Sequence, residues 1–327
     1  MDIFQIIPSI IGVALAIATP LILTSMAGLF CERSGVVDIG LEGKLNMSAF
    51  AAALSSYFIT IKWGLPMGAV VGIMAGMFAS FLMSLAHAYA CVSKSGDQVV
   101  SGVAINFFAT GFTIVVTRAL FGSGDTPPIK VSSGTFGTLF PSIDGSGILI
   151  NAYNKMIANQ NILTWVALAL IPIIWWILYR TRFGLRLRAV GENPQAVDTA
   201  GMSVKGLRYK GVLIGGLLCG MAGTYLSLGS SSLFIRDMAA GRGYIALVVL
   251  ILGRWRPIPT LLGCLLFGIL QASSDYLPLE PVLFGISLGN LSPIMNSLPY
   301  ILVLILMIFI GRSVAPAASG VPYKKER

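Results

Sequence analysis

Residues 180–210 read RTRFGLRLRAVGENPQAVDTAGMSVKGLRYK and form a basic segment between two apolar ones. The run TWVALALIPIIWWILY precedes it, GVLIGGLLCGMAGTYLSL follows it, and seven of its own residues are Lys or Arg. A basic loop between two membrane-spanning helices is held on the cytoplasmic side. The segment also carries Glu192 and Asp198 among residues that favour helices. This pattern predicts an amphipathic cytoplasmic surface that meets a soluble partner.

The composition is that of a membrane protein, because 56% of the residues are hydrophobic, 11% are charged and the mean hydropathy is +0.84. Soluble domains carry roughly 25% charged residues, so this chain has too few polar groups to cover a soluble surface. Apolar runs near ~20 residues match a hydrocarbon core about 30 Å thick. The runs are continuous rather than alternating, which excludes a membrane β-barrel. The sequence predicts an all-α, polytopic helix bundle, with residues 1–327 forming a single transmembrane domain.

About nine spans are expected, some of them short or broken. They lie near residues 6–29, 46–61, 66–92, 98–118, 162–180, 211–229, 243–253, 257–276 and 298–311. The first is interpreted as a retained helix, because the N-terminus lacks the basic region and cleavage site of a signal peptide.

The distribution of charge predicts the orientation of the chain. With residues 180–210 inside, the N-terminus lies outside, the C-terminus lies in the cytoplasm, and the Gly/Ser/Thr/Pro-rich loop 119–161 lies outside. Sixteen Lys and Arg then fall on the inside and six on the outside, which agrees with the positive-inside rule. The same rule accounts for the net charge of +9, so no nucleic-acid partner is expected.

Two helices carry small residues at four-residue spacing, which lets helix backbones approach closely. The first set is Gly68, Gly72, Gly76, Ser80 and Ser84, and the second is Gly211, Gly215, Gly216, Gly220 and Gly223. Both sets are interpreted as packing seams.

A polar segment, ERSGVVDIGLEGKLNMSAF at residues 32–50, interrupts the apolar pattern with five charged residues and several small ones. A charge at bilayer depth costs about 2.5–3.5 kcal/mol on insertion scales, so it faces a cavity or a partner. Broken helices are tolerated where they line an aqueous path. The alternative is an interfacial turn whose charges contact lipid headgroups and one another.

Amides and aromatic rings elsewhere in the spans suit a neutral, ring-bearing solute that forms hydrogen bonds. These groups could instead have structural roles: Asn106 could form a hydrogen bond between helices, and Asp237 could form an ion pair with Arg242. The predicted substrate pathway comprises Asp38, Glu42, Asn46, Asn106, Phe107, Phe108, Asp237 and Gln271.

No enzyme site or cofactor site is predicted. A lone His87 in an apolar helix supports neither a catalytic triad nor a histidine metal site, so packing is its expected role. The four cysteines show no metal-ligand spacing. The segment GLEGKL lacks the spacing and the hydroxyl of a P-loop, so ATP, if used, must bind another subunit.

Three segments together resemble a known family: GLFCERSGVVDIGLEG, LRAVGENPQAVDTAGMSV and DMAAGRGYIALVVLILGRW. The chain resembles, over about residues 10–312, the permease subunits of bacterial ABC importers of the nucleoside and simple-sugar type, in the branched-chain amino acid/ribose permease superfamily. The family often has asparagine at the position of Asp38. The resemblance implies that a coupling helix docks on the ATPase through Gly191, Glu192, Asn193, Ala196, Asp198 and Gly201.

The resemblance also implies the partners and the location. A cytoplasmic ABC ATPase, a second related permease in a heterodimer and an extracytoplasmic binding lipoprotein are expected, with the chain in the lipid of the bacterial inner membrane. Nucleosides are the first expectation for the substrate, while riboflavin and simple sugars stay open. An ion-coupled carrier using Glu42 and Asp275, and an integral membrane enzyme, are the alternatives from other classes.

Overall fold

The computed structural model describes residues 3–129, 132–145, 147–276 and 315–323, together with the single positions 297, 301, 305 and 308. Over these residues the chain is helical, as predicted, and the β pairing is limited to one isolated bridge between Thr138 and Asn161. All four cysteines are buried and free.

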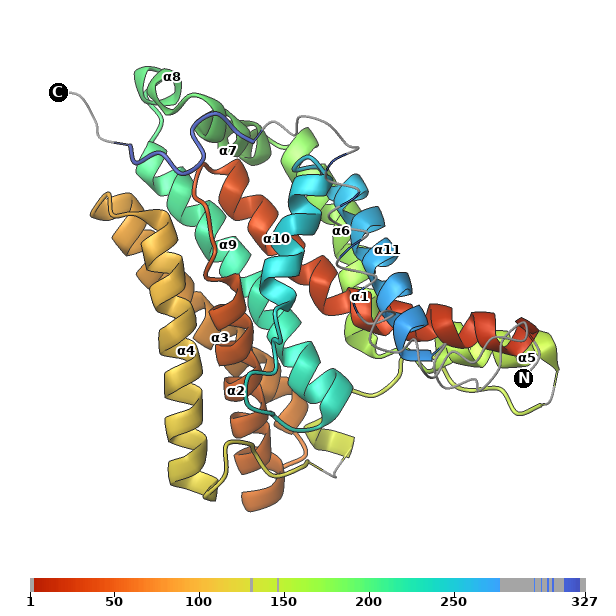
Figure 1. The fold of residues 1–327 in the computed structure, drawn as a ribbon. Coiled ribbons are helices and arrows are strands. Elements are labelled where there is room, and N and C mark those ends of the chain that lie inside the picture. The colour runs from red at the N-terminus through yellow and green to blue at the C-terminus, as the bar shows by residue number, and fades with distance from the viewer. Residues whose placement is uncertain are drawn as a thin grey trace.

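The α-helices follow one another along the chain with short π-helical turns at several ends (Figure 1). They are α1 (Ile3–Arg33), α2 (Leu41–Tyr57), α3 (Gly68–Ala88), α4 (Gln98–Phe121), α5 (Ile148–Tyr153), α6 (Ile162–Arg180), α7 (Arg182–Glu192), α8 (Pro194–Thr199), α9 (Val204–Thr224), α10 (Arg242–Leu252) and α11 (Pro257–Tyr276). The π-helical turns are η1 (Phe58–Lys62), η2 (Tyr89–Ser93), η4 (Asn154–Ala158) and η5 (Tyr225–Ser231), and η3 (Ser132–Gly134) is a 3₁₀ turn.

Six of these helices are long and apolar enough to cross a membrane, namely α1, α3, α4, α6, α9 and α11. The expected spans 46–61 and 243–253 correspond to α2 and α10, which are shorter, at 17 and 11 residues. The expected span 298–311 lies outside the described residues apart from isolated positions.

The predicted seams of α3 and α9 meet at Gly76, Gly216 and Gly220, whereas Gly211 and Gly215 face α1 and Gly223 faces α2. All ten small residues of these seams are buried. A β-carbon added at Gly220 would lie 2.5 Å from the Cα of Met77, and one at Gly216 would lie 2.3 Å from Oγ of Ser84. Side chains larger than hydrogen would therefore force the two helices apart, which confirms the seams.

Helix α1 links the two ends of the bundle. Near its start, Ser9 accepts a hydrogen bond from Lys155 and the carbonyl of Gly12 accepts one from Gln160, both in the segment after α5. At its other end, the guanidinium of Arg33 lies 3.7 Å from the carboxylate of Glu192. The loop 119–161 and the segment 180–210 therefore lie at opposite ends of α1.

The segment 180–210, which the sequence predicts as a loop, is largely helical and contains both α7 and α8. The side chain of Thr181 caps α7 by accepting from Gly184 N, and Asn193 caps α8 by accepting from Ala196 N at 3.0 Å. Pro194 occupies the first turn of α8, where a missing N–H costs nothing. Gly201, with φ +77°, follows α8 in the left-handed conformation that glycine adopts without strain.

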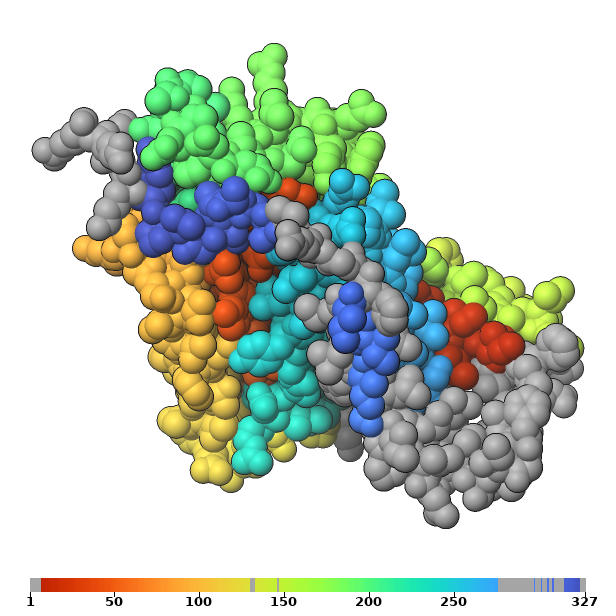
Figure 2. All heavy atoms as spheres, turned by 45° about the horizontal axis from the view of Figure 1, so that its top comes forward, coloured from red at the N-terminus to blue at the C-terminus, as the bar shows by residue number. Residues whose placement is uncertain are grey.

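The C-terminal residues 315–323 pack against this same end of the bundle, as Figure 2 shows in dark blue beside the green of α7 and α8. Ala318 N donates to the carbonyl of Gly191 at 2.8 Å, and the buried Arg208 donates to the carbonyl of Val321 at 2.9 Å. The C-terminal segment and α7 therefore share one side of the molecule.

Candidate functional site

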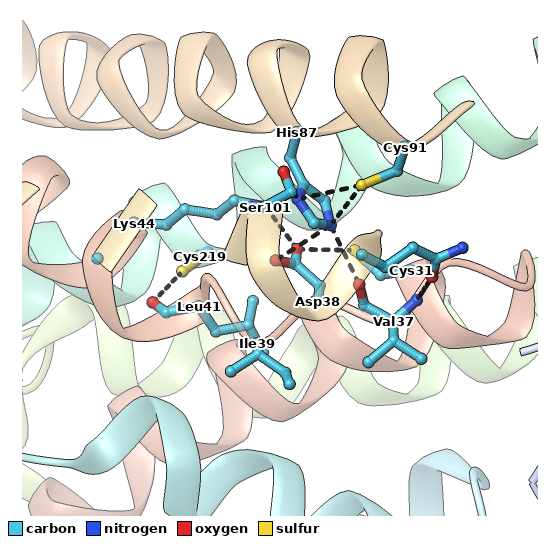
Figure 3. Close-up of polar contacts among 12 residues, drawn as sticks. Cys31, Val37, Asp38, Ile39, Leu41, Lys44, His87, Cys91, Ser101 and Cys219 are labelled. Atoms are coloured by element: carbon cyan, nitrogen blue, oxygen red, sulfur yellow. Dashed lines mark hydrogen bonds and ion pairs between the residues drawn. The ribbon is translucent and has the colours of Figure 1, made fainter. Parts of the chain in front are cut away.

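A buried ion pair stands at the junction between α1 and α2 (Figure 3). Nζ of Lys44, on the first turn of α2, donates to Oδ2 of Asp38 at 2.5 Å, and both side chains are fully buried. The thiol of Cys31 donates to the same oxygen at 3.4 Å. This arrangement matches the rule that a buried charge needs a partner of opposite sign.

His87 connects α3 to this junction. Its Nε2 lies 3.1 Å from the carbonyl oxygen of Val37, and its Nδ1 lies 3.0 Å from the hydroxyl of Ser101 on α4. A carbonyl can only accept, so Nε2 carries the proton and, in the neutral ring, Nδ1 accepts from Ser101. The ring thereby joins three segments in the interior, which agrees with the packing role predicted for it.

Glu42 and Asn46 hold the loop that precedes α10. The two carboxylate oxygens of Glu42 accept from Gly241 N at 2.6 Å and from Gly243 N at 2.7 Å. Asn46 accepts from Ala239 N at 2.9 Å and donates to the carboxylate of Asp237 at 3.0 Å. These bonds satisfy backbone donors at the start of α10, where a carboxylate is also favoured by the helix dipole.

The loop held in this way has an unusual backbone. Asp237 has φ +57° and Ala240 has φ +46°, a region that side chains with a β-carbon seldom occupy. Such residues cost of order 1–3 kcal/mol each and persist where the surroundings enforce them. The hydrogen bonds from Glu42 and Asn46 supply that enforcement, and strain of this kind is concentrated at functional sites.

Asn106 joins α4 to both α2 and α10. Its Oδ1 accepts from Gly43 N at 2.7 Å, while its Nδ2 donates to the carbonyl of Ile39 at 3.1 Å and to the hydroxyl of Tyr244 at 2.9 Å. Asn106 therefore forms hydrogen bonds between helices, which is the structural role that the sequence left open for it. Helix α2 is seen between α4 and α10 in Figure 1.

The three residues Asn106, Phe107 and Phe108 point in three directions, because successive residues of an α-helix are about 100° apart. Phe107 is 76% exposed, and Tyr244, whose hydroxyl contacts Asn106, is 46% exposed. Phe108 instead stacks on Phe112 and lines a cavity of about 640 Å³ between α3 and α4. The structure therefore separates the two phenylalanines that the sequence grouped.

We define the α4–α10 face as Val103, Phe107, Asp237, Ala240 and Tyr244, which are all exposed. Beneath it lie Glu42, Asn46 and Asn106, whose polar groups are engaged by the hydrogen bonds above. Asp38 is deeper, at the Lys44 ion pair. Gln271 lies apart from this group, on α11, where it donates to Asp275 at 3.2 Å.

The six predicted coupling residues gather around α7 and α8. Glu192, Asn193, Ala196 and Gly201 are exposed, Asp198 is half-buried and Gly191 is buried. Gly191 has a steric role, because a β-carbon there would lie 2.3 Å from the carbonyl oxygen of Arg33. Two surface hollows at this end are lined by coupling residues together with Tyr323 of the C-terminal segment.

Sequence reasoning missed Tyr244, the Lys44 partner of Asp38 and the contribution of residues 315–323. The motif GRGY did contain Tyr244, but only the fold shows that its hydroxyl meets Asn106, 138 residues earlier. The C-terminal segment has a weakly polar composition that carries no signal of its own.

The chain matches, over residues 10–311, the family described as "Branched-chain amino acid transport system / permease component". It is 41% identical to the guanosine ABC transporter permease protein NupQ of Bacillus subtilis (strain 168), over 99% of each chain. It is 32% identical to the nucleoside ABC transporter permease protein NupC of Lactococcus lactis subsp. cremoris (strain MG1363), over the whole of both. A putative glucose ABC transporter permease, TsgC13 of Haloferax volcanii, is 34% identical over 86% of this chain and 82% of its own.

Two more distant relatives come from the same bacteria. NupP, a guanosine ABC transporter permease protein of Bacillus subtilis, is 26% identical over 83% of this chain and 75% of its own. NupB, a nucleoside ABC transporter permease protein of Lactococcus lactis, is 25% identical over 81% of this chain and 72% of its own. Each of these organisms therefore has at least two permeases related to this chain.

The buried ion pair generates a prediction about stability. Lys44→Met leaves the carboxylate of Asp38 buried without its partner, which we expect to lower the free energy of unfolding by about 3–5 kcal/mol. Asp38→Asn in the Lys44→Met background removes the orphaned charge and should restore most of that loss. Thermal unfolding of the detergent-purified chain measures both effects.

The matched control is Lys210→Met, at an exposed position of α9, where we expect a change within about 0.5 kcal/mol. Equal destabilisation by the single and the double variant would show that the loss does not come from the uncompensated charge of Asp38.

Proposed function

This chain belongs to the branched-chain amino acid transport system / permease component family, and from that premise we propose that it is the membrane subunit of an ATP-driven nucleoside importer. The chain is a transport subunit and not an enzyme, as is the rule in this family, and ATP is hydrolysed by a separate subunit. The observation that carries the nucleoside assignment is its full-length similarity to NupQ and NupC.

The α4–α10 face supports a substrate of this class. Phe107 and Tyr244 present aromatic rings, and Asp237 presents a carboxylate that accepts hydrogen bonds. A nucleoside has a flat base for stacking and sugar hydroxyls for donation, so both kinds of group have a counterpart. Riboflavin shares these properties, and TsgC13 is named for glucose, so transport measurements must separate the three.

We place the translocation pathway along the α4–α10 face, opposite the second permease. In this proposal Phe107, Tyr244 and Asp237 contact the passing solute. Asn106, Glu42 and Asn46 act one layer below, by holding the backbone of α10 and its loop in position. The predictions that Asp38, Phe108 and Gln271 also line the pathway have less support, since each contacts other parts of the chain.

The proposed partners are supported by the family and by the positions of α7, α8 and loop 119–161 at opposite ends of the helix bundle. The ATPase is proposed to dock on α7 and α8 through Glu192, Asn193, Ala196, Asp198 and Gly201, while the buried Gly191 lets α7 pack closely against the end of α1. NupP and NupB support a related but different permease as the second membrane subunit. A binding lipoprotein would meet the opposite end, near loop 119–161.

The proposed orientation places the N-terminus outside and the C-terminus in the cytoplasm of a bacterial inner membrane. It is supported by the charge distribution and by the packing of residues 315–323 on α7.

The proposed function is tested with the permease pair, the ATPase and the binding lipoprotein reconstituted in proteoliposomes. We expect uptake of radiolabelled guanosine that requires ATP and is inhibited by other nucleosides. Excess glucose or riboflavin should leave that uptake unchanged. Uptake of glucose or riboflavin in place of guanosine, or uptake driven by an ion gradient without ATP, would refute the assignment.

A second prediction concerns coupling. Glu192→Lys reverses the charge of an exposed residue at the end of α7, beside Arg33 and the backbone N–H of Ala317. We expect guanosine-stimulated ATP hydrolysis to fall about tenfold, equivalent to roughly 1.4 kcal/mol, while the purified complex stays assembled.

Glu192→Gln serves as the matched variant, because it keeps the size and removes only the charge, and its effect should be smaller. Full stimulation in the assembled Glu192→Lys complex would mean that the end of α7 does not transmit ATP hydrolysis to transport.

A further inference from the structure

Three arginines from different elements surround one cavity at the α7 end of the bundle. Arg33 ends α1, Arg188 lies on α7 and Arg256 immediately precedes α11. The cavity has a volume of about 600 Å³, and its other walls are Trp175, Tyr179, Pro257, Ile258 and Pro259. The substrate pathway and the coupling residues proposed above do not include any of these eight residues.

The positive charge at this cavity exceeds the negative charge. Arg33 donates twice to the carbonyl of Trp255, at 3.0 and 2.8 Å, and lies 3.7 Å from the carboxylate of Glu192. Glu32 is buried and is engaged by the indole N–H of Trp255. The exposed carboxylate of Glu192 contacts Arg33, and the eight residues that line the cavity include three arginines and no Asp or Glu.

Arg188 has donor capacity left over. Its guanidinium lies over the ring of Tyr179, 4.7 Å from the centroid. Its Nε is buried and has no hydrogen-bond partner within the described part of the chain. Arg256 is exposed at the mouth of the same cavity. The Nε of Arg188 is closed to an external acceptor, but the terminal N–H groups of Arg188 also have no hydrogen-bond partner among the described residues and can donate to one.

We propose that this cavity binds the phosphate headgroup of an anionic phospholipid. Guanidinium groups match phosphate oxygens in geometry and charge, and paired N–H···O bonds make such contacts strong. The start of α11 adds little by itself, because Pro257 and Pro259 have no N–H to donate. The guanidinium groups are therefore the recognition elements.

The surroundings favour a lipid over free phosphate. From the wall residue Ile258 the exposed apolar surface of α11 continues to Leu262, and α6 exposes Ile173 and Trp176. Both helices are long and apolar enough to cross the membrane, so acyl chains can lie along these residues. Tryptophan and tyrosine at the cavity wall are typical of the headgroup level of a bilayer.

The expected position of the cavity in the membrane also favours an anionic lipid. In the proposed orientation the cavity lies on the cytoplasmic side, where anionic lipids attract basic residues close to the membrane. This step rests on the proposed orientation of the permease. A lipid phosphate held by Arg33, Arg188 and Arg256 would tie α7 to the ends of α1 and α11, next to the coupling surface.

Native mass spectrometry of the full chain in detergent tests the proposal. The chain is titrated with phosphatidylglycerol, with zwitterionic phosphatidylcholine of the same acyl chains, and with inorganic phosphate. We expect phosphatidylglycerol to bind at least tenfold more tightly than phosphatidylcholine. The Arg188→Gln/Arg256→Gln variant should lose at least tenfold of that affinity.

The control is Arg182→Gln, an exposed arginine of α7 that does not line the cavity, and it should bind the lipid as the unchanged chain does. The single variant Arg256→Gln separates loss of binding from misfolding, because the residue is exposed. We expect this variant to keep an unchanged melting temperature and still bind the lipid several-fold more weakly. Equal affinity for both lipids, an unaffected double variant, or binding of inorganic phosphate without lipid preference would each overturn the proposal. No transport is measured, so failure here is distinct from failure of the nucleoside assignment.

Discussion

The ion pair between Asp38 and Lys44 is the constraint on which the rest of the site depends. Both side chains are fully buried, and a buried charge without its partner destabilises a protein by several kcal/mol. The pair therefore ties the first turn of α2 to the connection between α1 and α2. That turn places Glu42 and Asn46 directly opposite the loop before α10. A displacement of α2 would break the hydrogen bonds to this loop and to Asn106 together.

The strained loop before α10 forms part of the α4–α10 face. Asp237 and Ala240 hold unfavourable backbone angles in a loop that Glu42 and Asn46 bind through Ala239 N and Gly241 N and that Arg242 binds through the carbonyls of Met238 and Ala239. The surface above is thereby shaped by buried groups that the solute need not touch. An importer fed by a binding protein benefits from weak contacts along its path, since tight binding would slow release. Moderately polar side chains on a rigid support meet that requirement.

The sequence predicted what depends on composition and local pattern, and missed what depends on distant contacts. Apolar runs and basic ends revealed the spans, the seams of α3 and α9, and the segment that contains α7 and α8, because membrane burial constrains each residue directly. Glu42 was selected for its charge, but its partners are backbone N–H groups 199 and 201 residues later. Phe107 and Phe108 were grouped as neighbours in sequence, whereas the helix turns them to different sides.

The central claim is that the α4–α10 face meets water and solute rather than lipid, and cysteine labelling tests it most directly. The four native cysteines are buried, so a cysteine replacing the exposed Phe107 can be labelled selectively by a charged, membrane-impermeant thiol reagent. We expect fast labelling in the assembled importer, slowed by guanosine and the binding lipoprotein. Met74→Cys, at an apolar position of α3 that is 66% exposed, should stay unlabelled in lipid. If Phe107→Cys were as unreactive as Met74→Cys, the face would lie in lipid and the proposed pathway would be contradicted.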